Sequence, residues 1–394
     1  MQVQGFSAAA VAAGIRYPNR LDLGLIFSAV PAVTAGAFTT NIVKAAPLQL
    51  DMERLRAGMA QAVVVNSGNA NACTGAAGME TARAVSTLAA DALAIEDSLI
   101  QVASTGVIGQ PMPLEPFSRS MVSLVDSLSP QGFTELAQAM MTTDTRPKTA
   151  SARVLIDGVE ISILGVAKGS GMIMPDMATM LCFVVTDARI DFPTLDRLVK
   201  IGVEQTFNRI TVDGDTSTND MVLVMANGLA GNVCIDAKTS SSMDQFGTAL
   251  QEVFRELALM VVADGEGATK MVTIRVTGAE SDREAVAAAR TIANSALVKT
   301  AFFGEDANWG RIIAALGRSG CTFNPDQVSI SFDAVLLVTN GQAVGGDTEA
   351  AATAVMQQPQ FAVTVHLHQG HADAEVYTCD FSFDYVKINA DYRS

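Results

Sequence analysis

The chain of 394 residues has few basic residues, few histidines and no obvious cysteine pairs, and each shortage excludes a class of function. It has 26 Lys and Arg residues and 41 Asp and Glu residues, so the formal net charge is −15 at pH 7. Because nucleic-acid binding depends on cationic contacts that release counterions, no nucleic-acid partner is expected. The five cysteines are scattered and include no C-x-x-C pair, which favours reduced thiols and a cytoplasmic location over a disulfide framework or a zinc site.

Long uninterrupted hydrophobic runs are also scarce. Residues 23–43 carry no charge, but Pro31 interrupts them and several polar side chains are spread through them. We therefore expect two buried strands joined at a turn, and no membrane span. The small-residue stretch near the N-terminus has no positively charged segment ahead of it, so a secretory signal is not expected either.

What the chain does have is an Ala- and Val-rich composition with 49% hydrophobic residues, typical of a compact globular protein. Apolar residues at helical spacing predict helices over 195–207 and 246–261, and two more are expected over 81–94 and 282–295. Period-two alternation predicts strands over 272–276 and 361–367, and Asp157-Gly158 predicts the turn of a hairpin over 154–169. Strands and helices alternate along the chain, which indicates a mixed α/β fold. We expect a main catalytic domain over 1–278 and a second domain over 279–394.

Two polar segments lie in the middle of the chain. In residues 168–179 the lysine precedes the glycines and a strand follows them, unlike a phosphate-binding loop. From local sequence alone, Thr179 is a polar residue at the start of a strand, because a threonine nucleophile needs an adjacent base. Residues 211–220 hold three carboxylates and four hydroxyls but lack the calcium-loop spacing, so a hydrogen-bonded structural loop is expected.

The chain's three histidines, His366, His368 and His371, form one short run. His366 and His368 fall on the polar face of the expected strand, so we predict a solvated face there and no metal site. A hydrolase that depends on histidine is therefore disfavoured, and a nucleophile would need a different base.

Loops dense in Asn, Gly and hydroxyl residues recur between apolar strands. Each could be a simple turn, but together they predict convergence on a site for a polar small molecule. They cover residues 63–75, 103–109, 141–148, 264–270 and 302–311.

Several long motifs follow one another along the chain: KGSGMIMPDMATML, TFNRITVDGDTSTND, DGEGATK, LVKTAFFGEDANWGRI and the C-terminal DYVKINADYRS. In these motifs the sequence resembles the ornithine acetyltransferase family, the glutamate N-acetyltransferases of arginine biosynthesis. The resemblance implies helices on both faces of paired β-sheets, an αββα sandwich, with a smaller C-terminal α/β domain. It also implies an α2β2 tetramer or a larger assembly, whose precursor cuts its own Ala178-Thr179 bond into an α-chain of residues 1–178 and a β-chain of residues 179–394.

The same resemblance assigns roles to the residues at matching positions. Thr179 would be the nucleophile, and Thr105 and Gly106 would form the oxyanion hole. Substrate would be bound by Thr142, Lys168, Thr179, Glu266, Asn389 and Ser394, with the C-terminal domain completing the site; many relatives end in threonine where this chain ends in Ser394. We interpret Lys168 as the partner of a substrate carboxylate and Glu266 as the partner of the ornithine ammonium.

The implied chemistry suits the small number of histidines. Cleavage would give Thr179 a free α-amine, whose reference pKa of about 7.7–8 allows it to act as a base near neutral pH. Its hydroxyl would take the acetyl group from N-acetylornithine and pass it to glutamate, by a ping-pong mechanism without a cofactor. The sequence leaves open whether acetyl-CoA is a second donor. Two alternatives also remain: an N-terminal-threonine aminopeptidase or amidase that uses water, and a non-catalytic amino-acid-binding protein.

Overall fold

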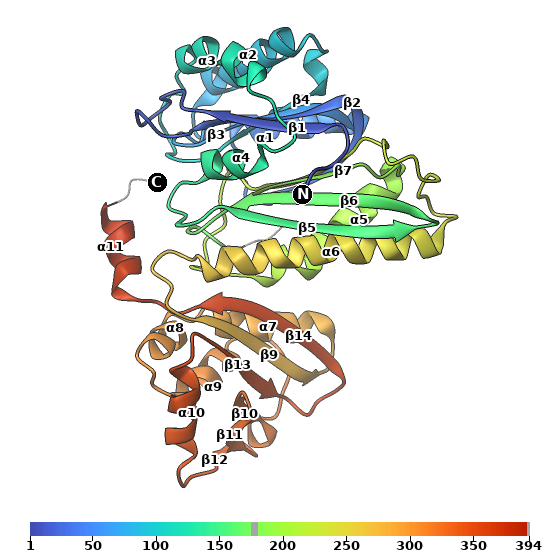
Figure 1. Cartoon of the computed structure of the whole chain (residues 1–394). Coiled ribbons are helices and arrows are strands. Elements are labelled where there is room, and N and C mark those ends of the chain that lie inside the picture. Colours follow the sequence, from blue (N-terminus) through green and yellow to red (C-terminus); the bar gives the residue numbers. More distant parts are fainter. Residues whose placement is uncertain (175–179, 392–394) are drawn as a thin grey trace. The chain divides into compact units, whose positions relative to one another are not determined.

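The computed structural model describes residues 1–174 and 180–391, which divide into two compact units (Figure 1). The first unit holds residues 1–208 and 215–261, and the second holds residues 209–214 and 262–391. The division therefore falls at Val262 and not near Gly278, where the sequence placed it. The reason is that β9 (Met271–Ala279), which contains Gly278, pairs on both sides with strands of the second unit.

The first unit is built on one sheet with the strand order β4-β3-β2-β8-β7-β6-β5, and β1 pairs with β2. Several of these strands are buried along their whole length, as apolar runs such as the one in β7 predict. The strands are β1 (Phe6–Val11), β2 (Leu23–Phe38), β3 (Met59–Asn66), β4 (Ile100–Ser104), β5 (Lys148–Ile156), β6 (Val159–Lys168), β7 (Leu181–Thr186) and β8 (Met221–Ala226).

Strand β2 corrects one sequence expectation, because the charge-free segment forms one long strand and not two strands joined at a turn. Its first part pairs with β1 and β3 and its last part pairs with β8, with an irregular register between Phe27 and Ala32. Pro31 lies in this irregular stretch, where its missing N–H costs no ladder hydrogen bond. The strand thus belongs to both halves of the sheet.

The two halves of this sheet face each other across a shared apolar layer, in which Val63 of β3 and Leu164 of β6 belong to one cluster. Helices cover the outer sides (Figure 1). Phe117 of α3 (Glu115–Asp126) packs on the β1–β4 half, and Leu257 of α6 (Ser240–Ala263) lies against Gly165 of β6. The first unit is therefore an αββα sandwich, which confirms the expected fold class.

The helices predicted over 81–94, 195–207 and 246–261 are present in the first unit, which also holds three helices that the sequence analysis did not predict. Asp191 caps α5 by accepting a hydrogen bond of 3.0 Å from the Thr194 amide, and Pro193 occupies its first turn. These helices are α1 (Ala46–Arg54), α2 (Gly75–Leu93), α3 (Glu115–Asp126), α4 (Phe133–Met140), α5 (Phe192–Gln205) and α6 (Ser240–Ala263). Across residues 1–174 and 180–391, no helix combines the length and the apolar character that a membrane span requires.

The hairpin of β5 and β6 confirms the predicted turn. Asp157 and Gly158 both have positive φ angles, 49° and 81°, as a two-residue turn between twisted strands requires. This hairpin carries Lys168 at its far end, where β6 stops.

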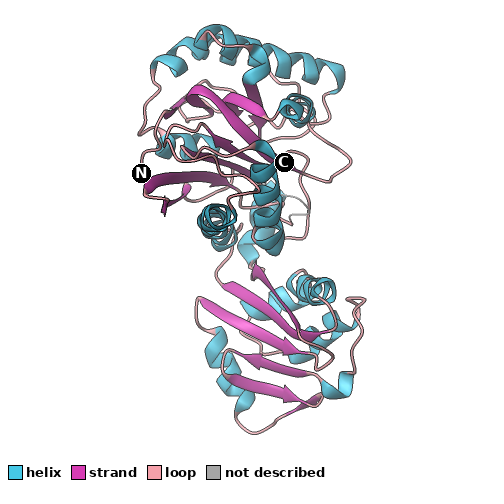
Figure 2. Cartoon of the chain, turned by 90° about the vertical axis from the view of Figure 1, so that its right-hand side faces the viewer, coloured by secondary structure: helices cyan, strands magenta, loops and turns pink. Residues whose placement is uncertain are grey.

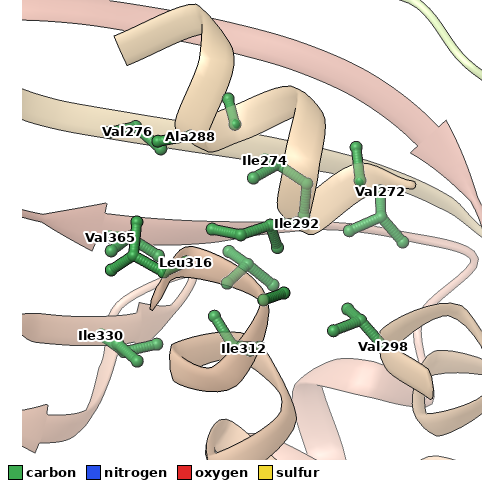
Figure 3. Close-up of a cluster of buried hydrophobic side chains, with 14 of the residues drawn as sticks. Val272, Ile274, Val276, Ala288, Ile292, Val298, Ile312, Leu316, Ile330 and Val365 are labelled. Carbon is green, nitrogen blue, oxygen red and sulfur yellow. The ribbon is translucent and has the colours of Figure 1, made fainter. Parts of the chain in front are cut away.

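The second unit is a smaller α/β unit with the strand order β12-β11-β10-β13-β9-β14. Helices cover one face of this sheet (Figure 2), and apolar side chains such as Ile274 and Ile292 meet there (Figure 3). Its remaining strands are β10 (Ser329–Phe332), β11 (Val335–Thr339), β12 (Gln342–Ala343), β13 (Gln360–His366) and β14 (Ala372–Cys379). Its helices are α7 (Asp282–Ala293), α8 (Ala296–Phe303), α9 (Trp309–Gly317), α10 (Thr348–Met356) and α11 (Phe383–Asp391).

Candidate active site

The loop after β4 holds the two residues expected to form an oxyanion hole. The Thr105 amide donates a hydrogen bond of 3.0 Å to the Asn66 carbonyl at the end of β3. Gly106 has a φ of 133°, and a Cβ atom there would lie 2.3 Å from the carbonyl carbon of Gly68. Only glycine therefore fits at this position without moving the backbone of the neighbouring loop.

Asn219 supports this loop from the segment that leads into β8. Its side-chain amide donates to the Ser104 carbonyl at 2.8 Å and to the Ala70 carbonyl at 2.6 Å. Because Asn219 is buried, these bonds fix the loop after β4 to the loop after β3.

Lys168 brings three of the expected residues together. It is 8% exposed, and its Nζ donates to Thr142 Oγ1 at 2.9 Å and to Thr105 Oγ1 at 3.2 Å. Thr142 lies in the loop between α4 and β5, Thr105 follows β4, and Lys168 ends β6. Segments far apart in the sequence thus converge on one buried ammonium group.

Asp144 is the carboxylate of this cluster, and the sequence analysis assigned it no role. Its Oδ1 accepts hydrogen bonds of 2.7 Å from the Gly169 amide and from Lys148 Nζ, and its Oδ2 accepts one of 3.0 Å from the Thr142 amide. Burial alone would raise the pKa of Asp144, but the charges of Lys168 and Lys148, together with these hydrogen bonds, lower it to about 2. Asp144 is therefore ionised at neutral pH.

Asp220, directly before β8, is also a buried carboxyl, but its pKa is shifted upward, in the opposite direction to that of Asp144. Burial raises its pKa well above the ordinary value, although hydrogen bonds from Ser217 and the charge of Lys168 act in the other direction. Within the described residues, its Oδ2 has no hydrogen-bond partner. The next amide, of Met221, donates to the Met180 carbonyl at 2.9 Å.

Ala178 and Thr179, the expected cleavage site and nucleophile, lie outside the described residues, and so does Ser394. The described chain resumes at Met180, beside the start of β8. The sequence assignments of these three residues stay predictions.

The second unit holds the other two expected substrate-binding residues. Asn389 of α11 donates a hydrogen bond of 2.7 Å from Nδ2 to Glu266 Oε2, and Glu266 is 7% exposed. Gly267 has a φ of 67°, and a Cβ atom there would lie 2.5 Å from the Tyr385 amide. The DGEGATK loop and the start of α11 are therefore packed closely, which fixes Glu266 beside Asn389.

The histidines lie on β13 and in the loop after it. His366 is half-buried and accepts or donates a hydrogen bond of 2.7 Å with Thr277, while His368 is exposed. This agrees with the expected polar face of the strand. Among the residues that the structure describes, no three His, Cys, Asp or Glu side chains are grouped as metal ligands.

Comparison with known proteins places the chain in a family. A sequence model of the ArgJ family matches residues 7–394. The chain belongs to the ArgJ family. The arginine biosynthesis bifunctional protein ArgJ of Desulfotalea psychrophila is 58% identical over 394 residues, and that of Geobacter sulfurreducens is 52% identical over 394 residues, with 100% of both chains covered in each case.

A solved ArgJ structure agrees with this assignment. The ArgJ protein of Bacillus halodurans is 44% identical, with a TM-score of 0.51, and the match covers 53% of this chain and 98% of that chain. The resemblance to the arginine-biosynthesis acetyltransferases is thus confirmed at the level of the family.

The sequence analysis of this ArgJ family member missed Asp144, Lys148 and Asp220. Asp144 and Lys148 lie within the loop 141–148 that the sequence marked as polar, but their spacing of four residues indicates a pair only on a helix, and this segment is a loop that leads into β5. Asp220 closes the segment 211–220, and no sequence signal distinguishes it from the other two carboxylates there.

Proposed function

We propose that this ArgJ family chain is an acetyltransferase that moves the acetyl group of N-acetylornithine to glutamate. The observation that carries the proposal is the convergence of Thr105, Thr142 and Lys168 in a chain that the family matches along nearly its whole length. The acetyl group would be held in between as an ester of the Thr179 hydroxyl, after cleavage of the Ala178-Thr179 bond has freed the α-amine of Thr179 to act as the base.

Lys168 is the proposed partner of the substrate carboxylate. Its amine is buried and oriented by two threonine hydroxyls, and charge-assisted hydrogen bonds are strongest where water is excluded. An amino-acid substrate carries such a carboxylate, so the site suits both the donor and the acceptor of the reaction.

Thr105 and Gly106 are the proposed donors to the oxyanion. The Thr105 amide is engaged by Asn66, so we assign the role to the Thr105 hydroxyl and the Gly106 amide. The tetrahedral intermediate carries its negative charge on the former carbonyl oxygen, and one such donor typically contributes about 10²–10³-fold in rate.

The base in this proposal is the α-amine of Thr179. It would take the proton from the Thr179 hydroxyl as Oγ attacks the acetyl carbonyl, and give it to the leaving amine of ornithine. Glutamate would then attack the ester, return the hydroxyl to Thr179 and leave as N-acetylglutamate. The atoms balance without a cofactor, because the acetyl group changes partner twice.

Glu266, Asn389 and Ser394 are also proposed to bind substrate. Glu266 is a carboxylate held by Asn389 and suits the side-chain ammonium of ornithine.

The cleavage and the assembly are part of the same proposal. The solved Bacillus halodurans chain corresponds to about 53% of this chain, close in length to the expected β-chain of residues 179–394, and this supports a cut at Ala178-Thr179. We further propose an α2β2 assembly, a cytoplasmic location, and acetyl-CoA as a second donor, since the relatives are named bifunctional.

The first experiment measures the denatured mass of the wild type beside Thr179→Ala. We expect fragments of about 18 and 23 kDa from the wild type, the larger beginning at Thr179, and one species near 41.2 kDa from the variant. Thr149→Ala, at an exposed position of β5, is the matched control and should be cut normally. A wild type that stays one folded chain would exclude this mechanism.

The second experiment measures ornithine release from N-acetylornithine with and without glutamate. Release that depends on glutamate, with N-acetylglutamate formed in equal amount, supports the transferase. Equal release without glutamate would instead show an amidase that uses water. Formation of CoA and N-acetylglutamate from acetyl-CoA and glutamate tests the second donor.

A further inference from the structure

We propose that Asp144 is a positioning residue of the active site, which holds Thr142 and Lys168 in the geometry that presents the Lys168 amine to the substrate carboxylate. The inference rests on the proposed function and deepens it, since it names what makes the carboxylate subsite rigid. Asp144 itself is not assigned any contact with substrate.

The Asp144 carboxylate accepts hydrogen bonds from the backbone at both Thr142 and the residue after Lys168. Asp144 Oδ2 accepts the Thr142 amide at 3.0 Å, and Oδ1 accepts the amide of Gly169, which directly follows Lys168, at 2.7 Å. The bond of 2.9 Å between Lys168 Nζ and Thr142 Oγ1 is therefore bracketed by backbone hydrogen bonds to the same side chain. A shift of Asp144 would move both partners of that bond.

Asp144 also has the electrostatic character that this position needs. Its side chain is fully buried and forms an ion pair of 2.7 Å with Lys148, whose side chain is 1% exposed. Buried carboxylates cost free energy unless hydrogen bonds and opposite charges stabilise them, and Asp144 has both. The pKa of about 2 means that the carboxylate stays charged at neutral pH.

A matched ion pair with no such role lies in the same unit. Asp196 and Lys200 of α5 have the same spacing of four residues and a distance of 2.6 Å, but their side chains are 28% and 57% exposed. Exposed ion pairs of this kind contribute little to stability. A change at Asp196 therefore shows the effect of losing an Asp–Lys pair that lies outside the active-site cluster.

The test compares Asp144→Glu and Asp144→Asn with Asp196→Asn, using N-acetylornithine as donor and glutamate as acceptor. Denatured mass and circular dichroism give the processed and folded fraction of each protein, and rates are expressed per processed, folded molecule. Asp144→Glu keeps the charge but moves the carboxylate by one methylene, so it separates positioning from charge.

For Asp144→Glu we expect the KM for N-acetylornithine to rise about tenfold while kcat changes by less than about threefold, because the loss falls on substrate binding. Asp144→Asn should have the larger effect, and Asp196→Asn should equal the wild type. A second readout is the preference for N-acetylornithine over N-acetylputrescine, which is the same donor without its carboxylate. If Asp144 positions Lys168, this preference falls in Asp144→Glu by about tenfold.

A purely structural role predicts something else: activity falls only in proportion to the folded protein, with the KM and the donor preference of the folded molecules unchanged. That result in Asp144→Glu would overturn the inference. Because Asp144→Glu is sufficient for this test, the inference stays testable even when Asp144→Asn does not fold. A wild type that does not transfer acetyl groups to glutamate would overturn the proposed function itself, so the two failures are distinguishable.

Discussion

Lys168 donates a hydrogen bond of 2.9 Å to the hydroxyl of Thr142, which lies 26 residues earlier in the chain. The same amine reaches the hydroxyl of Thr105 at 3.2 Å. The two hydroxyls fix the direction of the Lys168 amine, which suits a site that binds a carboxylate. The position of the Lys168 amine therefore depends on Thr142 and Thr105.

Lys168→Met should lower kcat/KM for N-acetylornithine by about 10–100-fold, because a hydrogen bond to a charged group is worth about 1.5–3 kcal/mol. Most of the loss should appear in KM, since the carboxylate is bound in the ground state as well as in the transition state. Steady-state kinetics measure both constants. Lys200→Met, at an exposed position of α5, is the control and should leave them unchanged. A wild-type KM in Lys168→Met would contradict the assignment of the carboxylate subsite.

Gly106→Ala should lower kcat by about 10²–10³-fold, because the new Cβ cannot fit beside the Gly68 backbone and would displace the proposed oxyanion donors. The matched control is Gly158→Ala in the turn between β5 and β6. Gly158 also has a positive φ, 81°, but a Cβ atom there meets nothing within 4 Å. The control shares the backbone strain without the clash, so it should lower stability modestly and leave kcat unchanged. Equal activity losses in both variants would show that strain, and not the oxyanion loop, is responsible.

The sequence predicted much of this cluster because its polar loops stand out between apolar strands. Thr105, Thr142 and Lys168 all lie in segments that were marked by composition or by the family resemblance. The sequence did not predict a role for Asp144, because its three hydrogen-bond partners come together only in the fold. Two of these partners are backbone amides, which no sequence pattern marks. A one-dimensional pattern does not show which carboxylate of a polar loop turns inward.

The fold was predictable wherever side-chain periodicity was strong, as in α5, α6, β9 and β13. It was not predictable at β2, where Pro31 indicated a break but an irregular register absorbed the missing donor. The unit boundary was also misplaced, because the pairing of β9 with β13 and β14 is non-local and leaves no mark in the sequence around Gly278.

Asn389→Ala should raise the KM for N-acetylornithine by about 5–10-fold, in line with about 1 kcal/mol for the hydrogen bond of 2.7 Å that it donates to Glu266. Without this bond the carboxylate of Glu266 can turn away from the substrate ammonium. Lys387→Ala, exposed on the same helix α11, is the control for effects on the helix itself. If Asn389→Ala and Lys387→Ala have the same kinetics, the pair of Asn389 and Glu266 has no part in substrate binding.

Asp51 of α1 lies outside the proposed active site and affects stability alone. Asp51 is fully buried; its Oδ1 accepts the Val102 amide at 2.9 Å, while its Oδ2 has no hydrogen-bond partner in the described part of the chain. Burial raises the pKa of Asp51 well above its ordinary value, although the Val102 hydrogen bond and the charge of Arg54 act in the other direction. The folded protein therefore binds a proton at Asp51 that the unfolded chain has already released.

Since the unfolded chain loses this proton near about pH 4, the wild type loses stability as the pH rises from there to the raised pKa of the folded state. Asp51→Asn keeps a carbonyl for the Val102 amide and has no proton to take up. Its free energy of unfolding should thus exceed that of the wild type at pH 7.5, and the difference should shrink toward pH 4.5. Urea unfolding at both pH values, in the uncut Thr179→Ala background, measures this, with Asp196→Asn as the exposed control. A difference that stays constant with pH would mean that Asp51 is ionised in the folded protein, with its charge stabilised by Arg54.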